Sequence, residues 1–387
     1  MRSWIPIALA FVFLPGCPTP LDLNRAKFTE IELYAWSGPS YCVGRPFQLN
    51  VELTTSEGDR YRTAKKGESL EESVPLDEFS FSALGGAVDS EGFVVDHDPV
   101  ATLQQPLEIQ VSLRRDPGLE ATLAMTPRYD CESEIVLRGE SGKTGEEGAD
   151  GEEGVIGADA PGDGAAENGH PGAVGAVGAA GVEGAAGHEV EVAVGMITTR
   201  WHRLVVLLRI TRLDDPEAAP AYHLIEAGAS EGFIISVEGG DGGPGGTGGR
   251  GGNGGDGGNN VAAMQPGDGG DGGEGGDGGD GGDGGQGGLI HVVYDNAHPE
   301  LTQWLRFSNP GGRGGRGGHG GNSGWGGRGG TSPGEKEGVD GMPGSPGRPG
   351  RKGRAGGLGL PGPEIDISAK PREELFAREI SLGIRFK

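Results

Sequence analysis

Regularly spaced acidic side chains are the first feature of this chain with the potential for chemistry. Between residues 267 and 288 the sequence repeats Gly-Gly-X, and the acidic X residues are Asp268, Asp271, Glu274, Asp277, Asp280 and Asp283. Carboxylate oxygens are the ligands that Ca²⁺ prefers, at roughly 2.4 Å. In a threefold extended helix every third residue lies roughly 9 Å further along one edge, so two carboxylates of one row cannot share an ion. The five aspartates are therefore predicted to hold at most loosely bound Ca²⁺, and no other cofactor is expected.

A second pattern imitates a catalytic motif without completing it. Residues 139–144 read Gly-Glu-Ser-Gly-Lys-Thr, as at the end of a phosphate-binding loop, but Leu137 stands where that motif begins with glycine. The helix that must follow is replaced by Gly-Glu-Glu-Gly at 145–148. The sequence has no His-Glu-x-x-His pair, no cysteine–histidine metal spacing and no nucleophile elbow. We therefore expect no catalytic residues and no enzymatic activity.

The start of the chain, residues 1–16, is predicted to be a signal peptide. Arg2 precedes an apolar stretch from 4 to 14 that is too short to span a bilayer as a mature helix. The stretch leads into Leu-Pro-Gly-Cys17, which resembles the lipobox of bacterial lipoproteins. The resemblance implies that Cys17 becomes the lipidated N-terminus of a tether at 17–26, and that Pro18 permits sorting to the outer membrane. An ordinary cleaved signal with an incidental cysteine is the alternative.

The remaining cysteines, Cys42 and Cys131, are an even pair in an exported chain, where disulfides form and persist. We predict a disulfide between them, and two buried free thiols are the alternative. The chain has 57 acidic and 32 basic residues and a formal net charge of −25. This charge argues against binding to nucleic acid and against electrostatic attachment to anionic lipid.

Residues 27–137 have the pattern of a β domain. The strand-like segments, several of them alternating with period two, are 28–34, 47–53, 78–84, 92–96, 107–113 and 119–125. About seven short strands without a strong helical stretch predict an immunoglobulin-like β-sandwich within a mainly β fold.

Apolar segments also alternate with glycine-rich sequence in residues 189–387. The segments that favour strands are 190–194, 196–212, 223–225, 233–237, 289–294, 364–367 and 379–386. Residues 299–307 fit a short amphipathic helix. Each glycine-rich excursion is therefore expected to leave a small β platform and return to it.

Glycine repeats of two kinds fill the intervening sequence. Gly-Gly-X repeats cover 239–258, 267–288 and 311–330, and Gly-X-Y blocks cover 139–187 and 338–362. Glycine at every third position suits a threefold extended helix whose bare edge lies against another backbone. Gly-Gly-X leaves two bare edges and suits the inside of a bundle, whereas Gly-X-Y leaves one and suits its rim. We therefore predict a Gly-X-Y region at 138–188 and a helix bundle interleaved with strands in 189–387.

This repeat pattern resembles that of the glycine-rich springtail antifreeze proteins, the glycine-rich tip adhesins of some phage tail fibres, and bacterial collagen-like surface proteins. The first two families imply packed polyglycine-II helices within one molecule. Third-position prolines in the last block are like those of collagen, so a trimeric triple helix is an alternative, and disordered runs are another. Basic X residues such as Arg313 and Arg316 predict either lateral pairing with an acidic edge or simple solvation.

Together these features predict a non-enzymatic, lipid-anchored structural or adhesive protein of the outer membrane or cell surface. It is expected to be a monomer rather than a trimer and to contact the membrane through its lipid. Its polysaccharide or protein partner is not identified, and no nucleic acid is expected. An extracellular binding module for polysaccharide or ice is the alternative, with ice disfavoured because the X edges are charged.

Overall fold

The chain folds into two compact units, Met1–Cys131 and Glu132–Lys387, and both are mainly β. A computed structural model describes residues 26–64, 73–95, 100, 103–161, 164–230, 232–260, 265–332, 342 and 344–387. Cys17 and the predicted signal peptide lie outside these residues. Within the described part of the chain, no helix is both long and apolar enough to cross a membrane.

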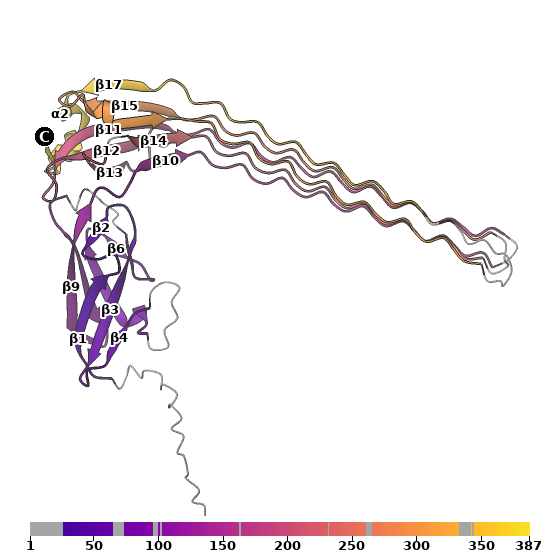
Figure 1. The fold of residues 1–387 in the computed structure, drawn as a ribbon, viewed down its shortest axis with the longest axis horizontal. Coiled ribbons are helices and arrows are strands. Elements are labelled where there is room, and N and C mark those ends of the chain that lie inside the picture. Colours follow the sequence, from indigo (N-terminus) through magenta and orange to yellow (C-terminus); the bar gives the residue numbers. More distant parts are fainter. Residues whose placement is uncertain are drawn as a thin grey trace, which may run out of the picture. The chain divides into compact units, whose positions relative to one another are not determined.

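Two β-sheets make up the first unit (Figure 1). One has the order β1 (Phe28–Ala35), β3 (Phe47–Thr55), β7 (Phe93–Val95), β6 (Ala87–Val88), with β4 (Arg60–Arg62) beside β3. The other has the order β2 (Ser40–Cys42), β9 (Asp116–Arg128), β8 (Leu107–Leu113), β5 (Phe79–Leu84), and a 3-10 turn, η1 (Leu76–Glu78), precedes β5. The strands predicted in this region are confirmed, and β2, β4 and β6 are additional short strands.

Alternation of apolar and polar residues gives each of these sheets one buried side. In β8, Leu107, Ile109, Val111 and Leu113 are at most 2% exposed, and the residues between them face outward. The predicted disulfide between Cys42 and Cys131 is present, with the two Cα atoms 5.8 Å apart, and it ties β2 to the residues that follow β9.

The boundary between the units falls before the strand at 134–138, although the sequence placed 137 at the end of the first domain. This strand, β10 (Glu134–Arg138), pairs in parallel with β14 (Phe233–Glu238), about a hundred residues further along the chain. It therefore belongs to the second unit, together with the glycine repeat that follows it.

Two sheets also form the platform of the second unit. The first is parallel and has the order β10, β14, β16 (Leu305–Ser308). The second has the order β13 (Ala221–Glu226), β12 (Val205–Arg212), β11 (Glu189–Thr198), β15 (Leu289–Asp295), β17 (Asp366–Lys370), with β18 (Arg385–Phe386) paired to the end of β11. Strands β11, β15 and β17 are parallel to one another.

The hydrophobic core of the platform draws on both sheets. Ile135, Phe233 and Ile235 from the parallel sheet lie in one cluster with Val192 and Val292 from the larger sheet, all at most 6% exposed. Burial of apolar surface stabilises a fold by roughly 25 cal/mol per Å². Burial in this shared core therefore holds the two sheets together.

The C-terminal segment corrects a sequence prediction. Residues 379–386 do not form one strand: α2 (Arg372–Leu375) and α3 (Ala377–Ser381) are followed by the short β18. The helical turn places Phe376 and Glu379 on one side, where both are fully buried. Glu379 accepts hydrogen bonds from Arg209 Nη1 at 3.1 Å and from Tyr222 Oη at 2.8 Å, which compensates the burial of its charge.

The helix expected at 299–307 is shorter than predicted. Helix α1 spans only Leu301–Trp304, and the chain then extends into β16, which pairs with β14. Pairing with a buried strand thus overrides the helical pattern of the second half of this segment.

Candidate functional site: the glycine runs

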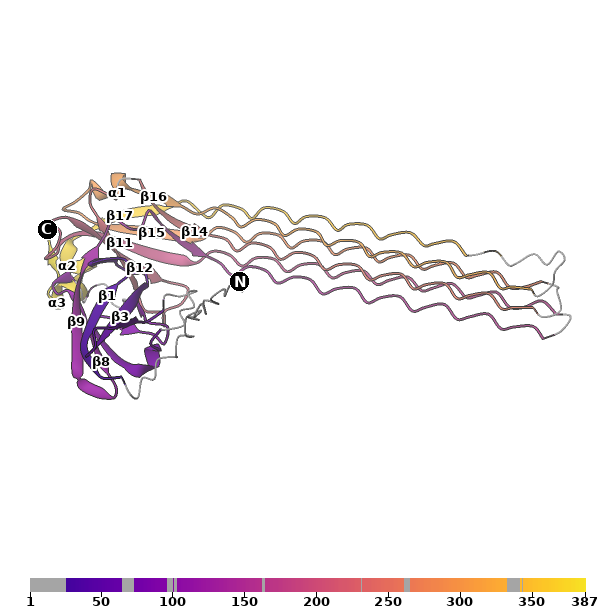
Figure 2. The ribbon, with the colours of Figure 1, turned by 60° about the horizontal axis from the view of Figure 1, so that its bottom comes forward.

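Six glycine-rich runs leave and re-enter the platform, side by side (Figures 1 and 2). We number them in chain order: run 1 (139–157), run 2 (169–187), run 3 (239–258), run 4 (267–288), run 5 (311–330) and run 6 (344–362). Runs 1, 3 and 5 follow β10, β14 and β16, and runs 2, 4 and 6 lead into β11, β15 and β17. The parallel strand order of each sheet is therefore continued as a layer of three runs.

Backbone hydrogen bonds join the runs within and between these layers. Gly148 of run 1 donates its N–H to Thr247 of run 3 at 2.8 Å, and Gly248 of run 3 donates to His319 of run 5 at 2.8 Å. Between layers, Gly249 of run 3 donates to Ala176 of run 2 at 2.8 Å. Each pattern repeats every third residue along the runs.

The contacts place runs 3 and 4 in the middle of the bundle. Run 3 exchanges backbone hydrogen bonds with runs 1, 2, 4 and 5, and run 4 does so with runs 2, 3, 5 and 6. Runs 1, 2 and 6, which are of the Gly-X-Y kind, lie at the rim, as the two kinds of repeat predict. Run 5 is Gly-Gly-X but bonds only to runs 3, 4 and 6, so it also lies at an edge.

Glycine is required because the backbones touch. A Cβ added at Gly249 would lie 1.9 Å from the carbonyl oxygen of Ala149, and one at Gly276 would lie 1.9 Å from that of Ala176. Atoms essentially never approach so closely, so either side chain would force the runs apart. Gly357 differs, because it occupies an outward X position and its nearest neighbour would be Asp283 Oδ1 at 3.4 Å.

Aspartate and asparagine at X positions add a second kind of contact, which we call the Asx bridge. The Oδ1 atom accepts the N–H of a residue on the adjacent run, and the N–H that follows the Asx residue donates to the carbonyl of that same residue. In one example, Arg351 N–H lies 2.7 Å from Asp277 Oδ1 while Gly278 N–H lies 2.8 Å from Arg351 O. The bridging residues are Asp150, Asp159, Asn168, Asp241, Asn253, Asp256, Asn259, Asp268, Asp271, Asp277, Asp280 and Asp283.

These bridges give the five predicted cation-binding aspartates a structural role. Asp271, Asp277, Asp280 and Asp283 each accept an N–H of run 6 at 2.6–2.7 Å, and Asp268 accepts that of Met342, shortly before run 6, at 2.7 Å. Within the described ranges, no three His, Cys, Asp or Glu side chains come close enough together to hold a metal ion. Loose Ca²⁺ binding along this row stays a prediction.

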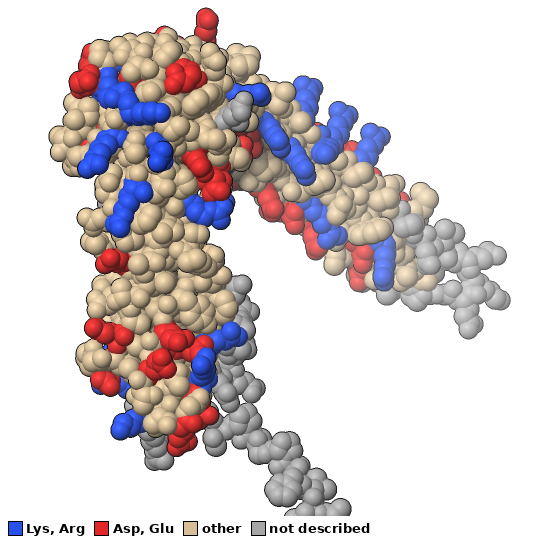
Figure 3. Space-filling view, turned by 60° about the vertical axis from the view of Figure 1, so that its left-hand side comes forward, with Lys and Arg blue, Asp and Glu red and all other residues tan. Residues whose placement is uncertain are grey.

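Charge is distributed unevenly over the runs. The acidic X residues lie along the whole of run 4. The basic residues of runs 5 and 6 are Arg313, Arg316, Arg328, Arg348, Arg351, Lys352 and Arg354. Figure 3 shows basic side chains in series along one side of the runs, with acidic side chains beside them. Among the residues with described positions, the ion pairs do not include one that joins two runs. The aspartate carboxylates of run 4 instead accept backbone N–H groups.

No family model matches this chain, and neither does any curated protein. What the runs can bind must therefore be argued from their own geometry.

Ion pairs mark the junctions between strands and runs. Arg138 at the end of β10 donates to Glu238 at the end of β14 at 3.0 Å, and this hydrogen bond raises the pKa of the Arg138 guanidinium. His188, between run 2 and β11, lies 2.9 Å from Asp214. Hydrogen bonds from Arg212 and then His188 hold the pKa of Asp214 below its ordinary value. These contacts link the strand ends at which runs 1, 2 and 3 meet the platform.

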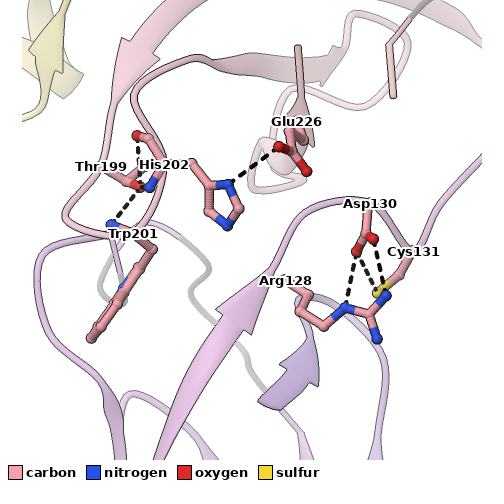
Figure 4. A network of polar contacts seen from close by, with 7 residues as sticks. All are labelled: Arg128, Asp130, Cys131, Thr199, Trp201, His202 and Glu226. Carbon is pink, nitrogen blue, oxygen red and sulfur yellow. Dashed lines mark hydrogen bonds and ion pairs between the residues drawn. The ribbon is translucent and has the colours of Figure 1, made fainter. Parts of the chain in front are cut away.

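A separate polar network organises the turn between β11 and β12 (Figure 4). Thr199 Oγ1 accepts the N–H groups of Trp201 at 3.1 Å and of His202 at 2.9 Å, and His202 Nδ1 lies 3.4 Å from Glu226. In the first unit, Arg128 pairs with Asp130 beside the disulfide at 2.9–3.0 Å, which raises the pKa of Arg128. Both networks stabilise turns, and neither has a nucleophile beside a base.

One hollow on the runs was not foreseen from the repeats. It measures about 460 Å³ and is lined by Arg250, Asn322, Ser323, Trp325, Pro346 and Pro349, from runs 3, 5 and 6. Its sequence signal is the segment Gly-Gly-Asn-Ser-Gly-Trp at 320–325, where a serine stands at a glycine position of run 5.

Proposed function

We propose that this chain is a non-enzymatic, lipid-anchored protein of the outer membrane or cell surface that displays a bundle of polyglycine-II helices as a structural or adhesive module. The observation that carries the proposal is the threefold repeat of backbone hydrogen bonds between the six runs. Such a module needs no side-chain core, because glycine backbones satisfy one another's polar groups directly. Its length is about 60 Å, from 20 residues at roughly 3.1 Å each.

Support for polyglycine-II geometry comes from the period and the direction of the contacts. Hydrogen bonds leave each inner run toward different neighbours at successive residues, as a threefold helix requires and a twofold strand does not. In the first unit, two mostly antiparallel sheets with a disulfide and buried alternating residues favour an immunoglobulin-like sandwich.

The intramolecular bonds favour a monomer over a collagen-like trimer. In a triple helix the glycine N–H groups of each chain are satisfied by the other chains. Here Gly350 and Gly353 of run 6 donate to Gly321 and Gly318 of the same chain, at 2.9 Å each. Every glycine N–H of run 6 thus has a partner within the same molecule.

Anchoring and display can be tested in a bacterial host that lipidates exported proteins. The full chain should fractionate with the outer membrane and be accessible to added protease on intact cells. Cys17→Ser should release it in soluble form, because two or more acyl chains are needed for durable attachment. Membrane retention of the serine variant, or the absence of lipid on the wild-type chain, would refute the proposed anchor.

A further inference from the structure

Two exceptions to the glycine repeat occur at one place. Ser323 is the single departure from glycine at the glycine positions of runs 3, 4 and 5, and Trp325 is the single Phe, Trp or Tyr residue in any of the six runs. They are two residues apart, and both line the hollow described above. Neither residue is required for the packing of the runs, because glycine occupies the equivalent packed positions and other side chains occupy the equivalent X positions.

Ser323 opens the bundle locally. It stands in the glycine row of run 5 that faces run 6, where a Cβ at the next row positions would lie 2.1 Å (Gly320) and 1.9 Å (Gly326) from a run 6 carbonyl oxygen. At this level the hydrogen bond from Gly347 N–H to Gly324 O is 3.2 Å, against 2.9 Å at the rungs on either side. Runs 5 and 6 therefore stand slightly further apart at the hollow.

Trp325 is exposed although its backbone is fixed. Its side chain is 71% exposed, so it contributes little to packing. Its N–H donates to Asn253 Oδ1 at 3.0 Å in an Asx bridge, and its carbonyl accepts from Gly254 at 2.8 Å. An indole held by its backbone on an open face is a preformed surface for stacking, and it loses little entropy on binding.

The side chains that line the hollow include a guanidinium, an amide and a hydroxyl, and no carboxylate. Arg250 Nη2 lies 3.2 Å from Asn253 Oδ1, and in the described part of the chain no carboxylate forms an ion pair with this guanidinium. The side chains of Asn322 and Ser323 also line the hollow, and Arg328 follows on the same row of run 5 as Trp325. An aromatic face beside an amide, a hydroxyl and a guanidinium suits a flat ring that carries hydroxyls and a carboxylate.

We propose that this hollow binds an acidic pyranose unit of a polysaccharide. The apolar face of the sugar stacks on Trp325, Arg250 receives the carboxylate, and Asn322 and Ser323 contact hydroxyl groups. The polymer continues along the basic row of run 5. This inference rests on the proposed surface role, because it names the partner of the displayed module.

Calorimetry of the purified full chain with an oligogalacturonate tests the site, with a neutral maltooligosaccharide of equal length as the comparison ligand. The acidic oligosaccharide should bind, and Trp325→Ala should weaken binding at least about tenfold, whereas Trp325→Phe retains part of it. Arg250→Gln should reduce the preference for the acidic over the neutral ligand. Thr247→Ala, on an exposed X position of run 3 outside the hollow, should bind like the wild type.

Ser323→Gly separates binding from stability. Restoring the repeat should let runs 5 and 6 close, so the melting temperature rises or stays the same while affinity falls. Unchanged affinity in Trp325→Ala, or equal affinity for the neutral ligand, would overturn the site. Surface display in the cell fractionation experiment is independent of Trp325, so loss of the sugar site leaves the proposed display role standing.

Discussion

Side-chain length decides which X residues stabilise the runs. Every bridging residue is Asp or Asn, whereas Glu274, in the same row of run 4, accepts no backbone N–H from the described residues of run 6. We attribute this difference to the extra methylene of glutamate, which makes its side chain longer than that of aspartate. Asn253 and Asn259 accept the same bond at 3.0 and 2.9 Å, against 2.6–2.7 Å for the aspartates of run 4, so the bridge requires an acceptor oxygen at this side-chain length and does not require a charge.

Substitutions of the run 4 aspartates should therefore destabilise the bundle only when the new side chain has no acceptor oxygen. We expect the simultaneous change of Asp271, Asp277, Asp280 and Asp283 to alanine to cost about 2–6 kcal/mol, from roughly 0.5–1.5 kcal/mol for each of the four hydrogen bonds. The same four positions changed to asparagine should melt close to the wild type. Thermal unfolding followed by circular dichroism measures both, and an equal loss in the two variants would instead favour pairing of charged edges.

The raised pKa of Tyr222 predicts that the platform loses stability at high pH. Burial and the hydrogen bond to Glu379 raise the pKa of Tyr222 from 10.0 to about 12. The folded state thus holds this proton more tightly than the unfolded state does, so the stabilisation is complete below pH 10 and is lost as the pH rises through about 12.

The matching experiment is denaturant unfolding between pH 9 and about pH 12. Tyr222→Phe should lose less stability than the wild type over this range, because it has no phenol to ionise beside Glu379. Parallel curves for wild type and Tyr222→Phe would contradict the prediction.

At the scale of elements, strands and runs form continuous units. The strand pairs β10 with β14 and β14 with β16 have partners 100 and 72 residues apart, and the Asx bridges of the runs that follow them have the same separations. The register of the paired strands is therefore also the register of the runs that follow them, so the side chains of the platform specify an alignment that a uniform glycine repeat cannot specify by itself.

Glycine substitutions test whether the backbones of neighbouring runs are in direct contact. Gly249→Ala should destabilise the second unit by about 1–3 kcal/mol, because its Cβ has no space between runs 3 and 1. Gly357→Ala is the matched control and should be neutral, because its Cβ points outward. Melting temperatures of the two variants compare them directly, and equal stability would mean that the runs do not pack as described.

Much of the fold could be predicted from the periodicity of the sequence, and the predictions that were wrong have physical causes. The strands with alternating or continuous apolar residues, such as 28–34 and 289–294, and the disulfide partners Cys42 and Cys131 followed from local pattern and parity. The strand at 379–386 was wrong because burial of Glu379 depends on Arg209 and Tyr222, which are distant in sequence. The Asx bridges were likewise missed, because they depend on register between runs.

At the scale of the molecule, the second unit combines two ways of excluding water. The platform buries apolar side chains between sheets, whereas the runs bury glycine backbone against glycine backbone. The second way leaves most X side chains at the surface, where those that do not form Asx bridges are free to vary. It allows a bundle to present a site such as the Trp325 hollow without disturbing its interior.

Amide hydrogen exchange of the intact chain tests the packed bundle most directly. The account predicts slow exchange at the glycine amides of 239–258 and 267–288, all of which donate to a neighbouring run or to the residues at its ends. In run 6 it predicts slower exchange at Arg351 and Arg354, which have Asx bridges, than at Arg348, which faces Glu274. Exchange of these glycine amides at the rate of an unstructured chain would contradict it.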